Sequence, residues 1–334
     1  MLDILCVGDA VIDIFLSINK NNPHFGLDKE KNKLLISFGE KINVEKYILD
    51  VGGNAANASV GLSRLGLDTG ILAEIGNDEF SQKILNKFKE EKINSELIIQ
   101  NDLEKTSFSI GINYNGERTL FVEHVQRDHN FNFANVNTNF LYLTSLGKNW
   151  EKAYIDTLSF SMKNNIKLAF NPGTLQIENR NKLITEIIEN TDYLFVNKEE
   201  AEIILYGKEL EISSENGNEN IIKKLMFGIK SLGVKNVIIT DSKNGSYVFD
   251  EKNKMYKFGI INVEVIEKTG AGDAYSAGFL AAILNNLSIQ EAIIWGSVNA
   301  SSVVGDVGAQ KGLLPKNALE EKLKLIKKLK VEEL

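Results

Sequence analysis

Hydrophobic and polar positions change their spacing several times along this chain of 334 residues. Short apolar or β-rich runs predict strands at 2–7, 10–16, 34–38, 47–51 and 71–75. The run 54–65 is rich in small residues and stops at Gly66, which is typical of a helix that ends on glycine. A lysine-rich surface helix is predicted at 79–92, and the polar stretch 19–33 is predicted to be irregular.

The segment from 107 to 125 has a different pattern. Two β-rich runs, 107–113 and 119–125, flank Asn115-Gly116, and Asn-Gly is the strongest short signal of a β-hairpin. A hairpin inserted among strands and helices predicts a small sheet that projects from the main one.

From residue 140 onward, strands and helices alternate regularly. Strands are predicted at 140–143, 168–171, 193–196 and 236–240, and helices at 150–164, 181–190, 220–232, 272–285, 288–304 and 316–330. This alternation predicts an α/β protein with a central, mostly parallel sheet covered by helices on both faces. We find no internal repeat and no low-complexity linker that would divide the chain.

Composition excludes several classes of function. The chain is 43% hydrophobic and 25% charged, which is normal for a globular protein, and its net charge of −7 does not suggest generic nucleic-acid binding. The single cysteine, Cys6, lies in an apolar run and is expected to be a buried structural thiol. We see no signal peptide and no run of about 18 apolar residues, so we expect a cytoplasmic protein without a membrane partner.

The strongest local signal is the run Thr269 to Asp273, Thr-Gly-Ala-Gly-Asp, which precedes an apolar helix. It is not the dinucleotide fingerprint, because Tyr275 stands where the third glycine should be. Two glycines before a helix let backbone N–H groups converge at its positive N-terminus, which predicts an anion hole. Asp273 is either a helix-favouring acidic residue or a base that takes the proton of a hydroxyl attacking a γ-phosphate.

A second signal is the pair Gly52-Gly53 before the early helix. Two glycines allow a ligand to approach the backbone closely. Asn57, one turn into the helix, either binds a ligand hydroxyl or is a buried asparagine in a glycine-rich turn.

A third signal, Asn197 with Glu200, follows the predicted strand 193–196. Residues three apart share one side of a helix. Asn197 either caps that helix or, together with Glu200, faces a ligand crevice at the carboxyl end of a parallel strand. A carboxylate in that position could hold Mg²⁺ through water.

These three patterns, in this order, resemble the PfkB family of sugar kinases, also called the ribokinase-like family. The resemblance covers almost the whole chain and includes Asp13 in the first strand pair. It implies one ribokinase-like kinase domain over residues 1–334, with a small β-sheet lid formed by inserts at about 14–50 and 96–126. The implied activity is ATP-dependent phosphorylation of a hydroxyl of a small sugar or sugar derivative. Two alternatives remain open, an adenosine-type nucleoside kinase and a non-catalytic sugar- or nucleotide-binding sensor.

The resemblance also implies a role for individual residues and names the partners of the site. It implies that Asp273 is the catalytic base and that the anion hole is formed by Gly270, Ala271 and Gly272. The implied acceptor site consists of Asp13, Gly52, Gly53 and Asn57. The implied nucleotide contacts are Asn197, Thr240, Gly245, Gly272 and Asn299, and Glu200 would hold Mg²⁺ through water. The implied cofactors are ATP and Mg²⁺, and a homodimer through the lid is a further expectation. For Asn299, a polar role in helix packing is the alternative, although the run from 296 to Gln310 resembles the helix and loop beside adenine.

Other polar residues leave questions open. His24, His124 and His129 make no convincing metal-ligand set and are expected at the surface or on the lid. Arg118, one of only four arginines, lies on the presumed hairpin and either binds an acidic group of the substrate or pairs with a neighbouring carboxylate. The family often has Asp-Thr-Thr where this chain has Glu267-Lys268-Thr269, which leaves a requirement for a monovalent cation open.

Overall fold

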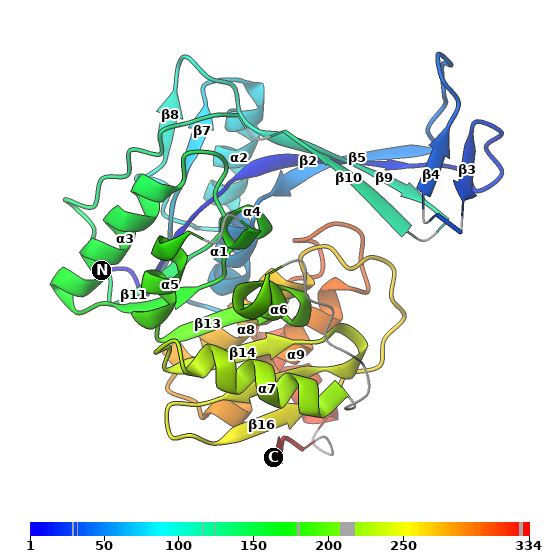
Figure 1. Cartoon of the computed structure of the whole chain (residues 1–334). Helices are drawn as coiled ribbons and strands as arrows, with labels where there is room; N and C mark the ends of the chain where they lie inside the picture. Colours follow the sequence, from blue (N-terminus) through cyan, green and yellow to red (C-terminus); the bar gives the residue numbers. More distant parts are fainter. Residues whose placement is uncertain are drawn as a thin grey trace.

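A computed structural model describes residues 1–28, 30–31, 33–115, 117–123, 125–178, 181–207, 218–326 and 330–334. Its main element is a nine-stranded sheet (Figure 1). The strands lie in the order β17 (Glu332–Glu333), β16 (Met255–Phe258), β15 (Ser246–Phe249), β14 (Asn236–Thr240), β13 (Tyr193–Asn197), β12 (Lys167–Phe170), β11 (Phe140–Leu143), β1 (Ile4–Val7) and β6 (Thr69–Leu72). The six strands from β14 to β6 are parallel, and β15, β16 and β17 extend the sheet in antiparallel fashion.

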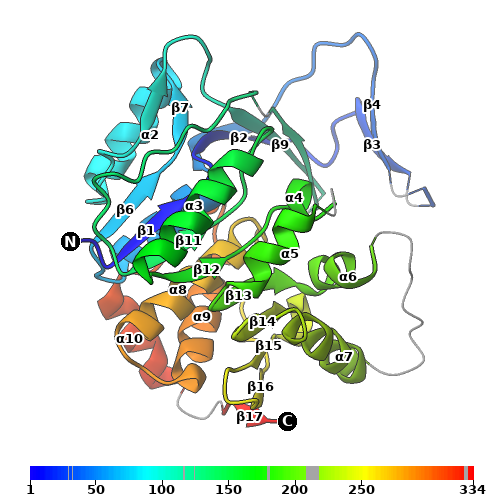
Figure 2. The same ribbon diagram turned by 60° about the vertical axis from the view of Figure 1, so that its left-hand side comes forward.

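Helices cover both faces of this sheet, as the regular alternation predicts (Figure 2). One face packs against α1 (Asn54–Arg64), α2 (Glu79–Glu90), α8 (Ala271–Leu284), α9 (Ile289–Val303) and α10 (Lys316–Leu325). The other packs against α3 (Glu151–Asn164), α5 (Lys182–Glu189), α6 (Lys198–Tyr206) and α7 (Asn218–Lys230), and the short α4 (Thr174–Glu178) contacts α6. Because both faces are covered, β1, β6 and β11 are buried along their whole length, and Cys6 is a buried thiol.

A second sheet of four strands projects from the body of the protein (Figure 1). It has the order β10 (Glu117–Val122), β9 (Phe108–Tyr114), β2 (Val11–Ser17) and β5 (Lys46–Gly52). β9 and β10 form the hairpin that Asn115-Gly116 predicts, although Gly116 itself lies outside the described residues. In the registers of β2, Asp13 lies opposite both Asp50 and Ser109, so the three polar side chains share one face.

Two sequence predictions about strands are wrong. The stretch 19–33 is not wholly irregular, because β3 (Phe25–Asp28) pairs with β4 (Lys33–Ile36) at the far end of the four-stranded sheet. The Tyr114 hydroxyl donates to the carbonyls of Lys20 and Phe25, both at 3.2 Å, which ties this hairpin to β9. The run 71–75 is not one strand, because β6 joins the large sheet whereas β7 (Glu74–Gly76) pairs with β8 (Ile99–Asn101).

The predicted helices are present, with ends that differ by a few residues. Gly66 follows α1 with φ +90°, a backbone conformation that favours glycine and ends the helix. α10 ends at Leu325, before the predicted position 330, and residues 327–329 lie outside the described part. Within the described ranges, no helix combines the length and apolar character needed to cross a membrane.

Candidate active site

The N-terminus of α8 forms an open, uncapped corner. Gly270 precedes the helix with φ +74°, and a Cβ there would stand 2.5 Å from the Cβ of Ala309, so the turn requires glycine. Gly272 is the opposite case, because no described atom beyond its own turn lies within 4 Å of where a Cβ would stand. Within the described residues no side chain caps α8, so the N–H groups of its first turn are available to an anion, apart from that of Ala271, which donates to the Lys268 carbonyl at 3.3 Å.

The carboxylate of Asp273 lies in this first turn and is only 7% exposed. Its Oδ2 accepts a hydrogen bond from Asn57 Nδ2 at 2.8 Å, and the Oδ1 of Asn57 in turn accepts one from Gln310 Nε2 at 3.0 Å. Burial raises the pKa of Asp273 to about 7; the Asn57 hydrogen bond opposes the rise, and the charges of Asp13 and Glu200 add to it. A carboxylate with this pKa is suited to accept a proton near neutral pH.

Asp13 stands nearby on the inner face of the four-stranded sheet. The hydroxyl of Ser109 donates to its Oδ1, and burial raises its pKa against the effect of that hydrogen bond. A Cβ at position 52 would stand 2.0 Å from Asp13 Oδ2, so Gly52 leaves the space that the carboxylate occupies. Gly53 has φ +94°, and a Cβ there would stand 2.4 Å from the carbonyl oxygen of Asp9. The predicted acceptor residues therefore form one cluster with Asp273.

Asn197 and Glu200 form a reciprocal cap at the start of α6. The Oδ1 of Asn197 accepts from the Glu200 N–H at 2.8 Å, and Glu200 Oε2 accepts from the Asn197 N–H at 2.9 Å. Burial raises the pKa of Glu200 to about 6. Asn197 is paired in register with Thr240, so the Asn197 and Glu200 motif lies beside the end of β14. Gly245, with φ +93°, closes the turn after β14 where a Cβ would stand 2.1 Å from a backbone oxygen.

The structure favours the packing interpretation of Asn299. This residue is 0% exposed, its Nδ2 donates to the Ala274 carbonyl at 2.8 Å, and its Oδ1 accepts from the Leu314 N–H at 3.1 Å. Both ends of the amide are engaged in joining α8, α9 and the loop after α9, so neither faces a nucleotide.

Arg118 pairs with a carboxylate, which is the second of its two predicted roles. Its Nη1 lies 2.6 Å from Glu267 Oε1, and its guanidinium stands 5.8 Å from the centre of the Phe15 ring. Glu267 also accepts from the Thr269 hydroxyl and from the Gly308 N–H at 3.0 Å. One carboxylate thus joins the β9–β10 hairpin to the turn before α8 and to the loop after α9.

The expected surface position of His129 is wrong. The side chain is 2% exposed, its Nδ1 lies 3.7 Å from Glu74 Oε2, and burial lowers its pKa. His24 is half-buried beside the β3–β4 hairpin, and His124 lies outside the described residues. Across the described positions, no group of three or more His, Cys, Asp or Glu side chains could hold a metal ion.

Two residues of the site were not assigned to it from the sequence. Ser109 contacts Asp13 because of the β2–β9 register, for which a single sequence carries no signal. Gln310 belongs to a loop whose resemblance points to adenine, yet its side chain contacts Asn57 on the acceptor side. The sequence signal for Gln310 was its place as a polar residue in a glycine-rich loop. The sequence did not show that its side chain points toward Asn57.

A buried carboxylate beside an uncapped helix N-terminus suits the transfer of a phosphoryl group to a hydroxyl. Comparison with known families agrees with this chemistry, because the profile described as pfkB family carbohydrate kinase matches residues 1–317. The chain therefore belongs to the pfkB family of carbohydrate kinases and is a phosphotransferase that acts on an alcohol group.

Curated relatives span nearly the same length. The chain is 26% identical to a 5-dehydro-2-deoxygluconokinase of Clostridium perfringens, over 96% of this chain and 93% of that protein. It is also 26% identical to a nucleoside kinase of Methanocaldococcus jannaschii, over 97% of each. The crystal structure of the Methanocaldococcus jannaschii nucleoside kinase superposes with a TM-score of 0.77 at 24% identity, covering 97% of this chain and 99% of that one. An Arabidopsis thaliana ribokinase complexed with ribose and ATP gives 0.77 at 18% identity, covering 97% and 99%.

Proposed function

We propose that this protein transfers the γ-phosphoryl group of ATP to a hydroxyl of a small sugar or sugar derivative. The observation that carries the proposal is the 2.8 Å hydrogen bond between Asn57 and Asp273. It joins the helix that follows the Gly52-Gly53 pair to the helix that follows the glycine-rich turn, so acceptor groups and a base stand beside the anion corner.

In the proposed reaction, Asp273 accepts the proton of the acceptor hydroxyl while the hydroxyl oxygen attacks the γ-phosphorus of ATP, whose bond to the bridging oxygen of ADP breaks so that ADP leaves. Asn57 holds the Asp273 carboxylate in place and orients it. The N–H groups of Gly270, Ala271 and Gly272 stabilise the charge on the transferred group, because backbone dipoles fixed in a turn need no reorganisation. Asp13 orients the acceptor through its hydroxyls.

The residues at the carboxyl ends of β13 and β14 fit a nucleotide and a divalent ion. Glu200 is half-buried and keeps Oε1 outside its helix cap, so its carboxylate is suited to hold Mg²⁺ through water. When bound, Mg²⁺ neutralises charge on the phosphates. Asn197, Thr240 and Gly245 line the neighbouring strand ends and are the proposed nucleotide contacts. The role of a monovalent cation stays open.

We propose that the four-stranded sheet is a lid over the acceptor. Its inner face presents Asp13, Asp50 and Ser109, which suit a polyol better than a planar base. The Phe15 ring on that face is covered by the guanidinium of Arg118, so it does not offer a free stacking surface. These contacts favour a sugar as the acceptor over a nucleoside. Nucleosides are the substrate class named for one relative.

A screen of ATP consumption over sugars, sugar acids and nucleosides tests this proposal. Wild type should consume ATP with at least one sugar or sugar acid, and Asp273→Asn should serve as the inactive blank. Turnover confined to nucleosides would replace the sugar by the nucleoside alternative. No turnover with any acceptor, while ATP still binds, would support the non-catalytic sensor instead.

Two further proposals concern assembly and location. Tyr47 is 69% and Phe121 is 53% exposed on the outer face of the lid sheet, which suits pairing of two lids. Sedimentation of wild type and of Phe121→Lys tests this homodimer, since the added charge should give a monomer. Because ATP is its proposed donor, we place the protein in the cytoplasm.

A further inference from the structure

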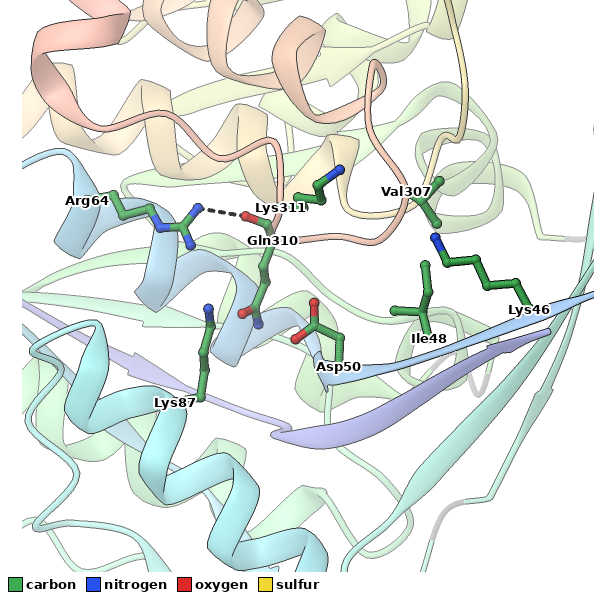
Figure 3. A pocket seen from close by; sticks show the side chains of 8 residues that line it. All are labelled: Lys46, Ile48, Asp50, Arg64, Lys87, Val307, Gln310 and Lys311. Carbon is green, nitrogen blue, oxygen red and sulfur yellow. Dashed lines mark hydrogen bonds between the residues drawn. The ribbon is translucent and has the colours of Figure 1, made fainter. Parts of the chain in front are cut away.

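A pocket of about 350 Å³ lies between the β5 edge of the four-stranded sheet and the loop after α9 (Figure 3). Its lining includes Lys46 and Asp50 of β5, and Val307 and Lys311 of that loop. At this edge, open space stands between the sheet and the loop. The position of the sheet relative to the anion corner therefore depends on contacts that are made elsewhere.

Arg118 makes such a contact from the opposite edge of the sheet, which is formed by β10. Its Nη1 lies 2.6 Å from Oε1 of Glu267, in the turn before α8. A Cβ at position 111 would stand 3.2 Å from Arg118 Cδ and 2.9 Å from Phe15 Cδ1, so Gly111 leaves the space in which these two side chains lie. The Glu267 side chain is 9% exposed, so water and salt screen this ion pair less than a pair at the surface.

Glu267 extends this contact to the anion corner. Its Oε1 also accepts from the hydroxyl of Thr269, which directly precedes Gly270, and its Oε2 accepts from the Gly308 N–H at 3.0 Å. Its own N–H donates to the Val304 carbonyl, at the end of α9, at 3.2 Å. The carboxylate is therefore fixed to the turn that forms the proposed anion hole, and loss of Arg118 from it would leave a negative charge beside that turn.

The same ion pair acts on the acceptor side of the site. Burial raises the pKa of Asp13, the positive charge of Arg118 lowers it, and the negative charge of Glu267 raises it. Arg118 and Glu267 therefore lie close enough to the proposed acceptor residues for their charges to be felt there. One ion pair thus connects a strand of the proposed lid, the acceptor face and the anion corner.

We propose that Arg118 and Glu267 are positioning residues that couple the lid sheet to the anion hole. A phosphate in the anion hole adds negative charge beside Glu267, so the guanidinium of Arg118 is held more strongly and the lid sheet moves less. Coupling between two sites is reciprocal, so the guanidinium in its place also strengthens phosphate binding. The inference rests on the proposed function, because the anion is the γ-phosphate of the bound nucleotide.

Hydrogen exchange of the backbone amides of β9 and β10 tests this coupling. In wild type, the magnesium complex of AMP-PNP, a non-hydrolysable analogue of ATP, should slow this exchange at least about twofold. Arg118→Met should abolish the protection by the analogue and should speed exchange in the free protein at least about twofold, whereas Arg118→Lys, which keeps the charge, should retain the protection. The control, Lys46→Met, removes a cation from the same sheet at a position without an ion-pair partner in the described part of the chain, and should exchange as wild type does.

Calorimetry with the same analogue separates this coupling from a merely structural role. Arg118→Met should weaken binding at least about twofold, because the charge of Glu267 is left uncompensated. Adding Glu267→Gln removes that charge, so the double variant should regain the affinity but not the protection of β9 and β10.

Two results would overturn the coupling. One is equal protection of β9 and β10 by the analogue in wild type and Arg118→Met, and the other is a further loss of affinity in the double variant. A wild type that does not bind the analogue would instead contradict the proposed function. The lid contact would then be judged in the free protein, where equal exchange in Arg118→Met and Lys46→Met would refute it.

Discussion

Replacing Asp273 by asparagine should make the protein less active and more stable at the same time. The substitution keeps the shape of the side chain, and its amide oxygen can still accept the hydrogen bond from Asn57 Nδ2. It removes the ionisable carboxylate, so proton acceptance is lost. We expect kcat to fall by at least about 10²-fold, the lower range for general base catalysis, with little change in ATP binding.

The size of the stability change follows from burial. The pKa of Asp273 is raised from 3.8 to about 7, which at 1.36 kcal/mol per pH unit corresponds to about 4 kcal/mol. Because the folded-state pKa is raised, the folded protein binds a proton that the unfolded chain has lost between these values. The resulting stability is fully present below pH 3.8 and is lost as pH rises through about 7. Asparagine never ionises, so the variant should be more stable than wild type at pH 8 and similar at pH 4.

Two measurements on wild type and Asp273→Asn test this reasoning together. For wild type, kcat/KM should rise with pH through about 7 and then level off, because the base must be ionised. Thermal unfolding at pH 8 should give the variant a Tm several degrees higher, and the difference should shrink toward pH 4. Turnover near that of wild type would exclude Asp273 as the base. A Tm difference that does not depend on pH would refute the buried-charge argument.

Two further predictions concern neighbours of the site. Gly52→Ala places a methyl group where it would stand 2.0 Å from Asp13 Oδ2, so the acceptor KM should rise about tenfold or more with the ATP KM unchanged. The control is Gly259→Ala, whose methyl group would meet none of the described atoms within 4 Å. An equal rise in both KM values would contradict it. Arg118→Met leaves Glu267 without its cation, so a cycle with Glu267→Gln should show a coupling of about 0.5–3 kcal/mol in thermal stability. Additive effects of the two substitutions would show that the 2.6 Å pair contributes nothing.

The parallel core of the fold could be predicted from the sequence because its strands are buried on both faces. The bounds of β11 and β14 agree with the predicted strands 140–143 and 236–240, which contain the apolar runs 140–143 and 237–239. β3 could not be found in the same way, because Phe25–Asp28 is half-exposed and pairs far from the core. The run 71–75 shows the opposite failure, since one apolar stretch supplies strands to two sheets and the pattern does not mark where the pairing partner changes.

The local geometry of the proposed site could be predicted where one short motif carries the proposed chemistry. The Gly-Ala-Gly turn and Asp273 are adjacent in the chain, so the sequence alone predicts that a helix begins there with exposed N–H groups. Contacts between distant segments were beyond reach: Arg118 and Glu267 are 149 positions apart, and Ser109 and Asp13 are 96 apart. Strand register determines the contact of Ser109 with Asp13, and one sequence gives no measure of register. Glu267 lies in the loop between β16 and α8, so its contact with Arg118 depends on how that loop packs against the hairpin.

The bond between Asn57 and Asp273 links residues 216 positions apart. During synthesis on the ribosome, at about 5–20 residues per second, the acceptor half of the site is made first and its base follows ten seconds or more later. Until α8 has emerged and docked against α1, a nascent chain lacks Asp273, the group that we propose receives the acceptor's proton. A fragment that stops short of α8 should therefore be unable to transfer phosphate.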